Sequence, residues 1–139
     1  MSADFKELER LRQQVEKLEK YDIDKFTRDA TNEIAQRLFA KVVKRTPVGQ
    51  YPANTGKVGG TLRRGWEMTQ VKQVAGGYEV QVVNPVNYAE YVNYGHRTRN
   101  HKGWVEGYFF LEKSELEIEQ ELPRLIKRKL TKFLQDKLK

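Results

Sequence analysis

The sequence predicts an α+β fold, in which a long core helix packs on a small antiparallel β-sheet and an amphipathic helix lies at each end. Apolar residues recur every four positions from Phe26 to Val42, as on one face of a helix. Two segments of alternating apolar and polar residues flank the glycines at 76 and 77, as in a β-hairpin. From Leu111 onward the apolar residues follow a helical period.

The first segment, residues 4–21, predicts an amphipathic helix. Its narrow apolar stripe consists of Phe5, Leu8, Leu11, Val15 and Leu18, and a stripe this thin needs a partner surface. The main core helix is expected over residues 24–44, with Asp22 or Asp24 as its N-cap. Thr46-Pro47 should end it, because the residue before a proline is disfavoured in a helix.

The middle of the chain predicts a loop followed by a hairpin. Residues 46–61 hold two prolines and four glycines without periodicity, so we expect a long loop of the kind that often carries function. Alternation from Trp66 to Val74 and from Tyr78 to Val83 predicts two strands joined at Ala75-Gly76-Gly77. A lone hairpin is only marginally stable, so it should lie against the helix over residues 24–44.

Residues 84–111 form the segment that the rest of the chain is expected to present. A short helix of one or two turns should end at Gly95 in a left-handed conformation. A basic loop from His96 to Lys102 should follow, before Trp104 and residues 108–111 return the chain to the core. The residues expected to pack the short helix on the sheet are Tyr88, Ala89, Tyr91 and Val92.

The last segment predicts a helix from residue 112 to residue 139. Its glutamates come early and its lysines and arginines come late, which complements the helix macrodipole. Pro123 should kink this helix or start a second one, because its ring cannot donate the usual hydrogen bond. The chain is thus expected to be one domain over 1–139, with an N-terminal helical arm (1–22), a core (24–111) and a C-terminal helix (112–139).

Composition narrows the possible functions. The 139 residues carry a net charge of +7 and no cysteine, which removes disulfides, thiol catalysis and thiolate metal sites. No apolar run approaches the length of a membrane span, so no membrane role is expected. Residues 41–66 contain six basic side chains and no acidic one, and residues 124–139 contain seven basic and one acidic. These stretches could face nucleic acid or an acidic protein, or only keep the surface soluble.

Enzymatic chemistry finds little support in the sequence. The two serines, Ser2 and Ser114, lie outside any Gly-x-Ser-x-Gly motif. The two histidines, His96 and His101, lie in a predicted loop with Glu106 as the nearest carboxylate, and such loop spacing says little about metal binding. We therefore expect no enzyme and assign no catalytic, cofactor-binding or metal-binding residue, keeping a small hydrolase or metal enzyme only as a low alternative.

Single-stranded nucleic-acid binding is the more serious alternative. It would combine cations with aromatic stacking surfaces, although aromatic residues at helical spacing more often belong to a core and no known RNA-binding signature is present. The residues concerned are Arg63, Arg64, Trp66, Tyr88, Tyr91, Tyr94, Arg97, Arg99, Lys102 and Trp104.

Four blocks of sequence resemble a known family. They are Thr46-Pro47-Val48-Gly49, the block from Gly59 to Trp66, the block from Asn84 to Arg97, and Gly103-Trp104-Val105-Glu106-Gly107 followed by Phe110-Leu111. Over residues 26–138 the chain resembles the small tail-component proteins of tailed phages, in particular the version in defective PBSX-type prophages and related contractile phage-tail particles. It departs from the simplest family pattern in a longer insert between Val48 and Leu62 and a short loop between Arg97 and Gly103.

The resemblance implies a structural virion protein, assembled in the bacterial host cytoplasm, and implies no catalytic residue. It implies a neck or tail-completion subunit in a homo-oligomeric ring at the head-proximal end of the tail, with a hexamer favoured by the six-fold tail. Expected partners are tail terminator, tube, sheath or connector proteins, with non-specific DNA phosphate contacts where basic loops line the lumen. The candidate protein-contact residues are Arg63, Arg64, His96, Arg97, Arg99, Lys102, Trp104 and Glu106. The structural motif residues are Thr46, Pro47, Trp66, Tyr88, Ala89, Tyr91, Val92, Gly95, Phe110 and Leu111.

Overall fold

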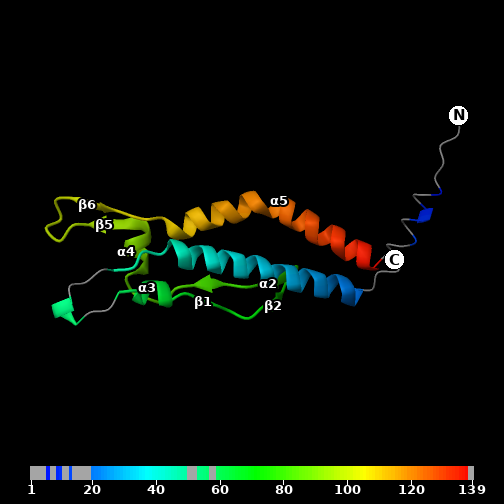
Figure 1. The fold of residues 1–139 in the computed structure, drawn as a ribbon, viewed down its shortest axis with the longest axis horizontal. Helices are drawn as coiled ribbons and strands as arrows, with labels where there is room; N and C mark the ends of the chain where they lie inside the picture. The colour runs from blue at the N-terminus through cyan, green and yellow to red at the C-terminus, as the bar shows by residue number, and fades with distance from the viewer. Residues whose placement is uncertain are drawn as a thin grey trace, which may run out of the picture.

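The computed structural model describes residues 20–49, 53–56 and 59–137, together with Lys6, Glu9, Arg10 and Gln13. Two long helices, α2 (Lys20–Arg45) and α5 (Phe110–Lys137), run antiparallel along the molecule, and a ribbon of short strands lies along α2 (Figure 1). The predicted α+β class is confirmed. Most of the helix predicted over residues 4–21 lies outside the described residues.

The helix α2 covers the four-residue apolar repeat and ends at Arg45, directly before Thr46-Pro47. It already includes Asp22 and Asp24, so the N-cap expected at one of these residues is wrong. Ala35 and Val42 are buried on α2, and Ile118 and Leu125 are buried on α5. Toward the other end of the pair, Phe26 and Phe133 stack with ring centroids 4.7 Å apart. The apolar seam between the helices therefore runs over most of their length.

Ion pairs of opposite polarity hold the two ends of the helix pair. Near the core, Glu117 of α5 pairs with Lys41 (3.0 Å) and with Arg45. At the far end the polarity is reversed, because Lys137 of α5 pairs with Asp22 at 3.0 Å. Partly exposed pairs contribute little singly, but this arrangement favours antiparallel packing of the two helices.

Four short strands form the predicted hairpin, which lies against α2 as expected. They are β1 (Glu67–Met68), β2 (Lys72–Val74), β3 (Gly77–Glu79) and β4 (Val82–Val83). The pairs β1–β4 and β2–β3 are antiparallel, and the chain turns at Ala75-Gly76. Between them the register shifts by one, so residues 70 and 71 stand opposite residue 80, as in a β-bulge.

The core lies where the helix α3 (Thr61–Arg64) and the start of α5 meet α2. Its buried centre consists of Val42, Leu62, Trp66 and Phe110, and the Trp66 and Phe110 rings meet edge to face at 5.8 Å. Thr46 is fully buried beside them. Its hydroxyl accepts a 2.7 Å hydrogen bond from Trp66 Nε1 and donates one of 2.5 Å to the Val42 carbonyl. A buried indole N–H thus has a partner, as burial requires.

The segment after Asn84-Pro85 forms the helix α4 (Ala89–Tyr94) and then a hairpin of β5 (Gly95–Arg97) and β6 (Trp104–Glu106). The short helix was predicted. The loop expected from His96 to Lys102 is correct for residues 98–102, but His96 and Arg97 belong to β5, which pairs with β6. Gly95 ends α4 with φ +93°. Its ψ of 173° is not left-handed helical, so the chain passes directly into β5.

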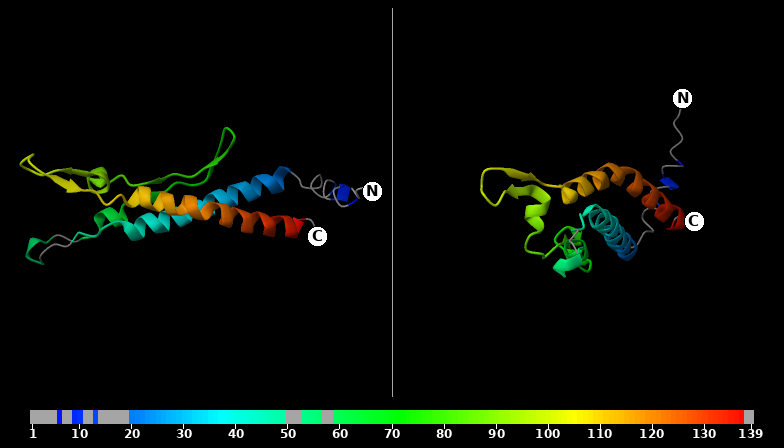
Figure 2. Two further views of the ribbon diagram at one scale, coloured as in Figure 1. Left: turned by 90° about the horizontal axis from the view of Figure 1, so that it is seen from above. Right: turned by 60° about the vertical axis from the view of Figure 1, so that its left-hand side comes forward.

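The helix α5 is continuous through Pro123, which starts no second helix. Figure 1 shows its axis arched over α2 in the middle, as expected near a proline. The hairpin β5–β6 lies at one extremity of the molecule and the C-terminal end of α5 at the other (Figure 2). In the loop before α3, residues 53–55 form the 3₁₀ turn η1 (Ala53–Thr55). None of the described helices is long and apolar enough to cross a membrane.

Candidate interaction surfaces

Large apolar side chains are exposed at the end of the molecule formed by α4, the β5–β6 hairpin and residues 107–109. We name this set the aromatic end: Tyr88, Tyr91, Tyr94, Trp104, Val105, Tyr108 and Phe109. Tyr91 is 61% exposed, and Trp104 and Tyr108 are each 56% exposed. This concentration of exposed apolar side chains makes the aromatic end a candidate interaction surface.

The predicted packing role of the α4 residues is correct only in part. Ala89 and Val92 pack against the buried core. Tyr91 points outward, and its ring meets His96 edge to face with centroids 6.0 Å apart. The packing expected of Tyr91 is therefore wrong, because Tyr91 lies on the side of α4 that faces away from the core.

The tip of the β5–β6 hairpin is an ordered turn held by its own side chains. Thr98 Oγ1 donates to Asn100 Oδ1 at 2.6 Å, and Asn100 Oδ1 also accepts from the Lys102 amide at 3.0 Å. Arg97, Arg99 and Lys102 are exposed around this turn. Within the described part of the chain their side chains make no ion pair. Together with Trp104, they present cations beside an exposed aromatic ring.

The other two candidate contact arginines have partners within the subunit. The Arg63 guanidinium donates to the Thr46 carbonyl at 2.7 and 2.9 Å and to the Lys44 carbonyl at 3.2 Å. It therefore caps the C-terminal carbonyl groups of α2. Arg64 donates to the Gly59 carbonyl at 3.1 Å and stays exposed. The remaining candidates are His96, which is half-buried on β5, and Glu106, which is exposed on β6.

Asn93 of α4 joins this helix to α5 through its hydrogen bonds, and we call this contact the joint. No feature of the sequence singles out Asn93. It is 4% exposed, and its Nδ2 donates to both carboxylate oxygens of Glu112 at 3.0 and 2.9 Å. Its Oδ1 accepts from the Leu111 amide at 3.3 Å. Its carbonyl accepts from the Phe109 amide at 2.9 Å. Gly107 passes so close that a Cβ there would lie 2.3 Å from the Asn93 carbonyl oxygen.

Tyr94, at the rim of this joint, has a raised pKa. Glu112 hydrogen-bonds to the Tyr94 hydroxyl and places negative charge beside it, and both effects raise the pKa of Tyr94 above its ordinary value. Next to it, Phe109 adopts φ +50°, and its ring meets that of Tyr94 edge to face at 6.4 Å. A positive φ is costly for a residue with a side chain, so the fold holds an exposed aromatic ring in a strained position.

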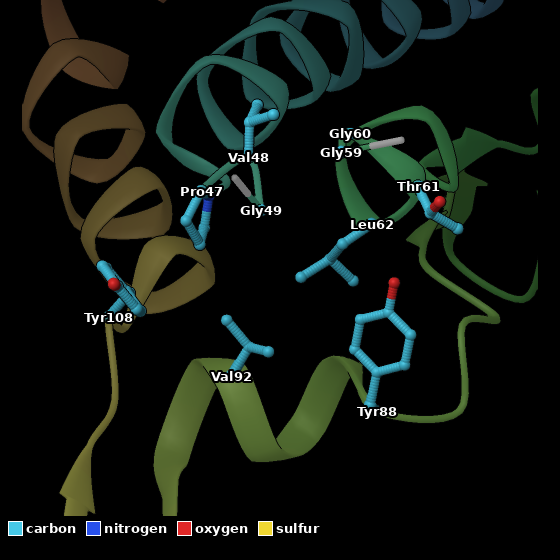
Figure 3. A pocket seen from close by; sticks show the side chains of 10 residues that line it. All are labelled: Pro47, Val48, Gly49, Gly59, Gly60, Thr61, Leu62, Tyr88, Val92 and Tyr108. Atoms are coloured by element: carbon cyan, nitrogen blue, oxygen red, sulfur yellow. The ribbon is translucent and has the colours of Figure 1, made fainter. Parts of the chain in front are cut away.

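A cavity of about 370 Å³ lies between α4 and the start of α3 with the loop before it. It is lined by Pro47, Val48, Gly49, Gly59, Gly60, Thr61, Leu62, Tyr88, Val92 and Tyr108. Figure 3 shows Leu62 and Val92 pointing toward one another across it, with the Tyr88 hydroxyl directed at the start of α3. The described lining residues form no cluster of titratable groups. Among the described residues, no group of three or more His, Asp or Glu side chains could hold a metal ion.

Residues 9–95 match a protein-family model described as "Bacteriophage HK97-gp10, putative tail-component". The match covers more than half of the chain. The protein belongs to this family of phage tail components. The resembling blocks at 46–49 and 59–66, and 84–95 of the third block, lie inside the matched region, whereas 103–111 lies beyond it. No curated protein and no solved structure matches significantly.

Membership gives the protein a structural role in the phage particle, where it contacts other tail proteins.

Proposed function

We propose that the protein is a ring-forming neck or tail-completion subunit at the head-proximal end of the tail. The version most similar to it would be that of PBSX-type prophages and related contractile tail particles. The whole chain would act as a single tail-component domain, made in the host cytoplasm and incorporated into the particle there.

The aromatic end carries this proposal. A ring subunit uses two different patches, so that the same heterologous contact repeats around an axis until it closes. Aromatic residues and arginine are enriched in protein interfaces, and the aromatic end combines Trp104 and several tyrosines with Arg97 and Arg99. Its neighbour would be a second copy of the chain, in a hexamer that matches the six-fold tail. A tail terminator, tube, sheath or connector protein would bind the ring from above or below.

Mass measurement tests the proposal on the purified chain, alone and mixed with tail tubes. The expected result is a ring in at least one of the two samples, since docking can order a neck protein. The double variant Arg97→Glu with Arg99→Glu should stay folded and lose assembly. Lys25→Glu with Arg28→Glu on α2 makes the same charge change away from the aromatic end and should assemble normally. A monomer that never joins tails would contradict the proposal.

A second candidate function uses the same surface. Tyr91 and Trp104 are exposed near Arg97 and Arg99, which suits stacking and phosphate contact with a single strand. Filter binding of labelled single strands across a salt series separates the two candidates. Submicromolar binding that Tyr91→Ala and Arg97→Ala abolish, without any assembly onto tails, would favour the single-strand binder.

A further inference from the structure

A second charged surface lies on α5, far from the aromatic end. Four cations occupy one side of the C-terminal half of this helix and line a shallow groove together with two polar side chains. We name this surface the cationic face: Arg124, Lys127, Arg128, Thr131, Lys132 and Gln135. Its four cations are exposed. Figure 1 shows that α5 forms one edge of the molecule, with α2 between it and the strand ribbon.

The cations of the cationic face differ from the other two lysines in the C-terminal half of α5, Lys129 and Lys137. Lys129 pairs with Glu33, and Lys137 pairs with Asp22, so both hold α5 against α2. Within the described part of the chain, the four cations of the cationic face make no ion pair. Cations near the C-terminal end of α5 complement the helix macrodipole. That effect does not explain why these four lie together on one side of the helix with no carboxylate among them.

The composition of the cationic face suits a polyanion better than a protein. Protein interfaces are enriched in aromatic residues and depleted in lysine. The lining of the cationic face contains no apolar side chain, and the exposed Ile126 and Leu130 do not belong to it. Phosphate groups, in contrast, are bound by lysine and arginine together with hydroxyl and amide side chains, which is the set that this groove offers.

We infer that the cationic face of α5 binds the phosphate backbone of DNA, without sequence preference. This inference rests on the proposed function, which places the ring where DNA passes from head to tail. From Arg124 to Gln135 the helix rises about 16 Å, and phosphates follow one another every ~3.4 Å along each strand of a duplex. One subunit can therefore neutralise up to four phosphates on one strand.

The test measures binding of the full chain to a labelled 30-base-pair duplex over a salt series. The key variant is Lys127→Gln, Arg128→Gln, Lys132→Gln. The matched control is Lys20→Gln, Lys25→Gln, Arg28→Gln, which removes the same charge from exposed positions on α2. The slope of log K against log salt is negative, and each lost phosphate contact should make it less negative by about 0.9. For the α5 variant the slope should therefore be less negative by roughly 2.7, and the affinity at low salt should fall about tenfold or more.

The control variant should bind DNA as the unmodified chain does, and the α5 variant should still assemble onto tails. Equal losses in both variants would show a general effect of net charge and overturn the inference, as would unchanged binding by the α5 variant. Lost assembly with unchanged DNA binding would assign the cationic face to an acidic protein neighbour. DNA binding that only the α5 variant loses, in a chain that never joins tails, would uphold the cationic face and refute the ring. Circular dichroism of each variant confirms that it is folded.

Discussion

Replacing Asn93 by alanine should destabilise the subunit more than the replacement of any other polar side chain, either at the surface or between helices. The change removes two hydrogen bonds to the Glu112 carboxylate and leaves the Leu111 amide without its acceptor. A hydrogen bond to a charged group contributes about 1.5–3 kcal/mol, and an unsatisfied buried group costs about 1–3 kcal/mol. Because these effects overlap at one side chain, we expect a loss of about 3 kcal/mol in the free energy of unfolding.

Urea unfolding followed by circular dichroism measures this loss. With a slope of about 2 kcal/mol per molar urea, the midpoint should fall by roughly 1.5 M. Asn87→Ala is the matched control, since Asn87 is an exposed asparagine just before α4, and it should change stability by less than about 0.5 kcal/mol. If Asn93→Ala lowers the midpoint no more than Asn87→Ala, then Asn93 does not join α4 to α5.

A double-mutant cycle isolates the contact itself. Asn93→Ala and Glu112→Ala should be non-additive by at least about 0.5 kcal/mol, because residues in one hydrogen-bond network couple. Additive effects would show that the loss comes from the backbone around Asn93 rather than from its contact with Glu112.

Three further predictions test the core and the aromatic end. Thr46→Val should cost about 1–3 kcal/mol in unfolding experiments, because it leaves the Trp66 N–H buried without an acceptor; a neutral effect would contradict the assigned bond. Glu112→Gln should lower the pKa of Tyr94 in an NMR titration of ring-labelled tyrosine. Because that pKa is raised in the folded chain, its contribution to stability is present at neutral pH and is lost only as the pH rises through the raised pKa. Phe109→Gly should leave stability within about 1 kcal/mol, since relief of the positive φ offsets lost contacts, yet it should weaken assembly measured by mass.

The elements predicted from the sequence are those whose side chains repeat with a clear period. The core helix, the hairpin that turns at Ala75-Gly76, the short helix α4 and the C-terminal helix all formed where expected. The β5–β6 hairpin was missed because residues 96–103 contain no apolar side chain, and because its turn is held by the Thr98 and Asn100 side chains instead of paired glycines. No alternation of apolar and polar residues can mark such a hairpin.

Roles that depend on distant segments were also beyond the sequence. Arg63 was expected to contact a partner, but the carbonyl groups that it caps lie 17 and 19 residues earlier in the chain. Asn93 stands between Val92 and Tyr94 like any polar residue of a surface helix, and only the return of the chain at residues 107–112 buries it. The contact surface predicted between His96 and Glu106 keeps its exposed arginines and Trp104, and its role in assembly stays a prediction.

The pairing of α2 with α5 also constrains how the subunit is made. Contacts such as Lys41–Glu117 and Asp22–Lys137 join residues 76 and 115 positions apart, and Phe110 supplies a quarter of the buried centre of the core. Long-range contacts of this kind form late, because the chain between them must first be closed into a loop. During synthesis, the side of α2 that packs on α5 therefore stays exposed until α5 has left the ribosome. A chain truncated before Phe110 should stay unfolded, so only completed subunits would be available to build a particle.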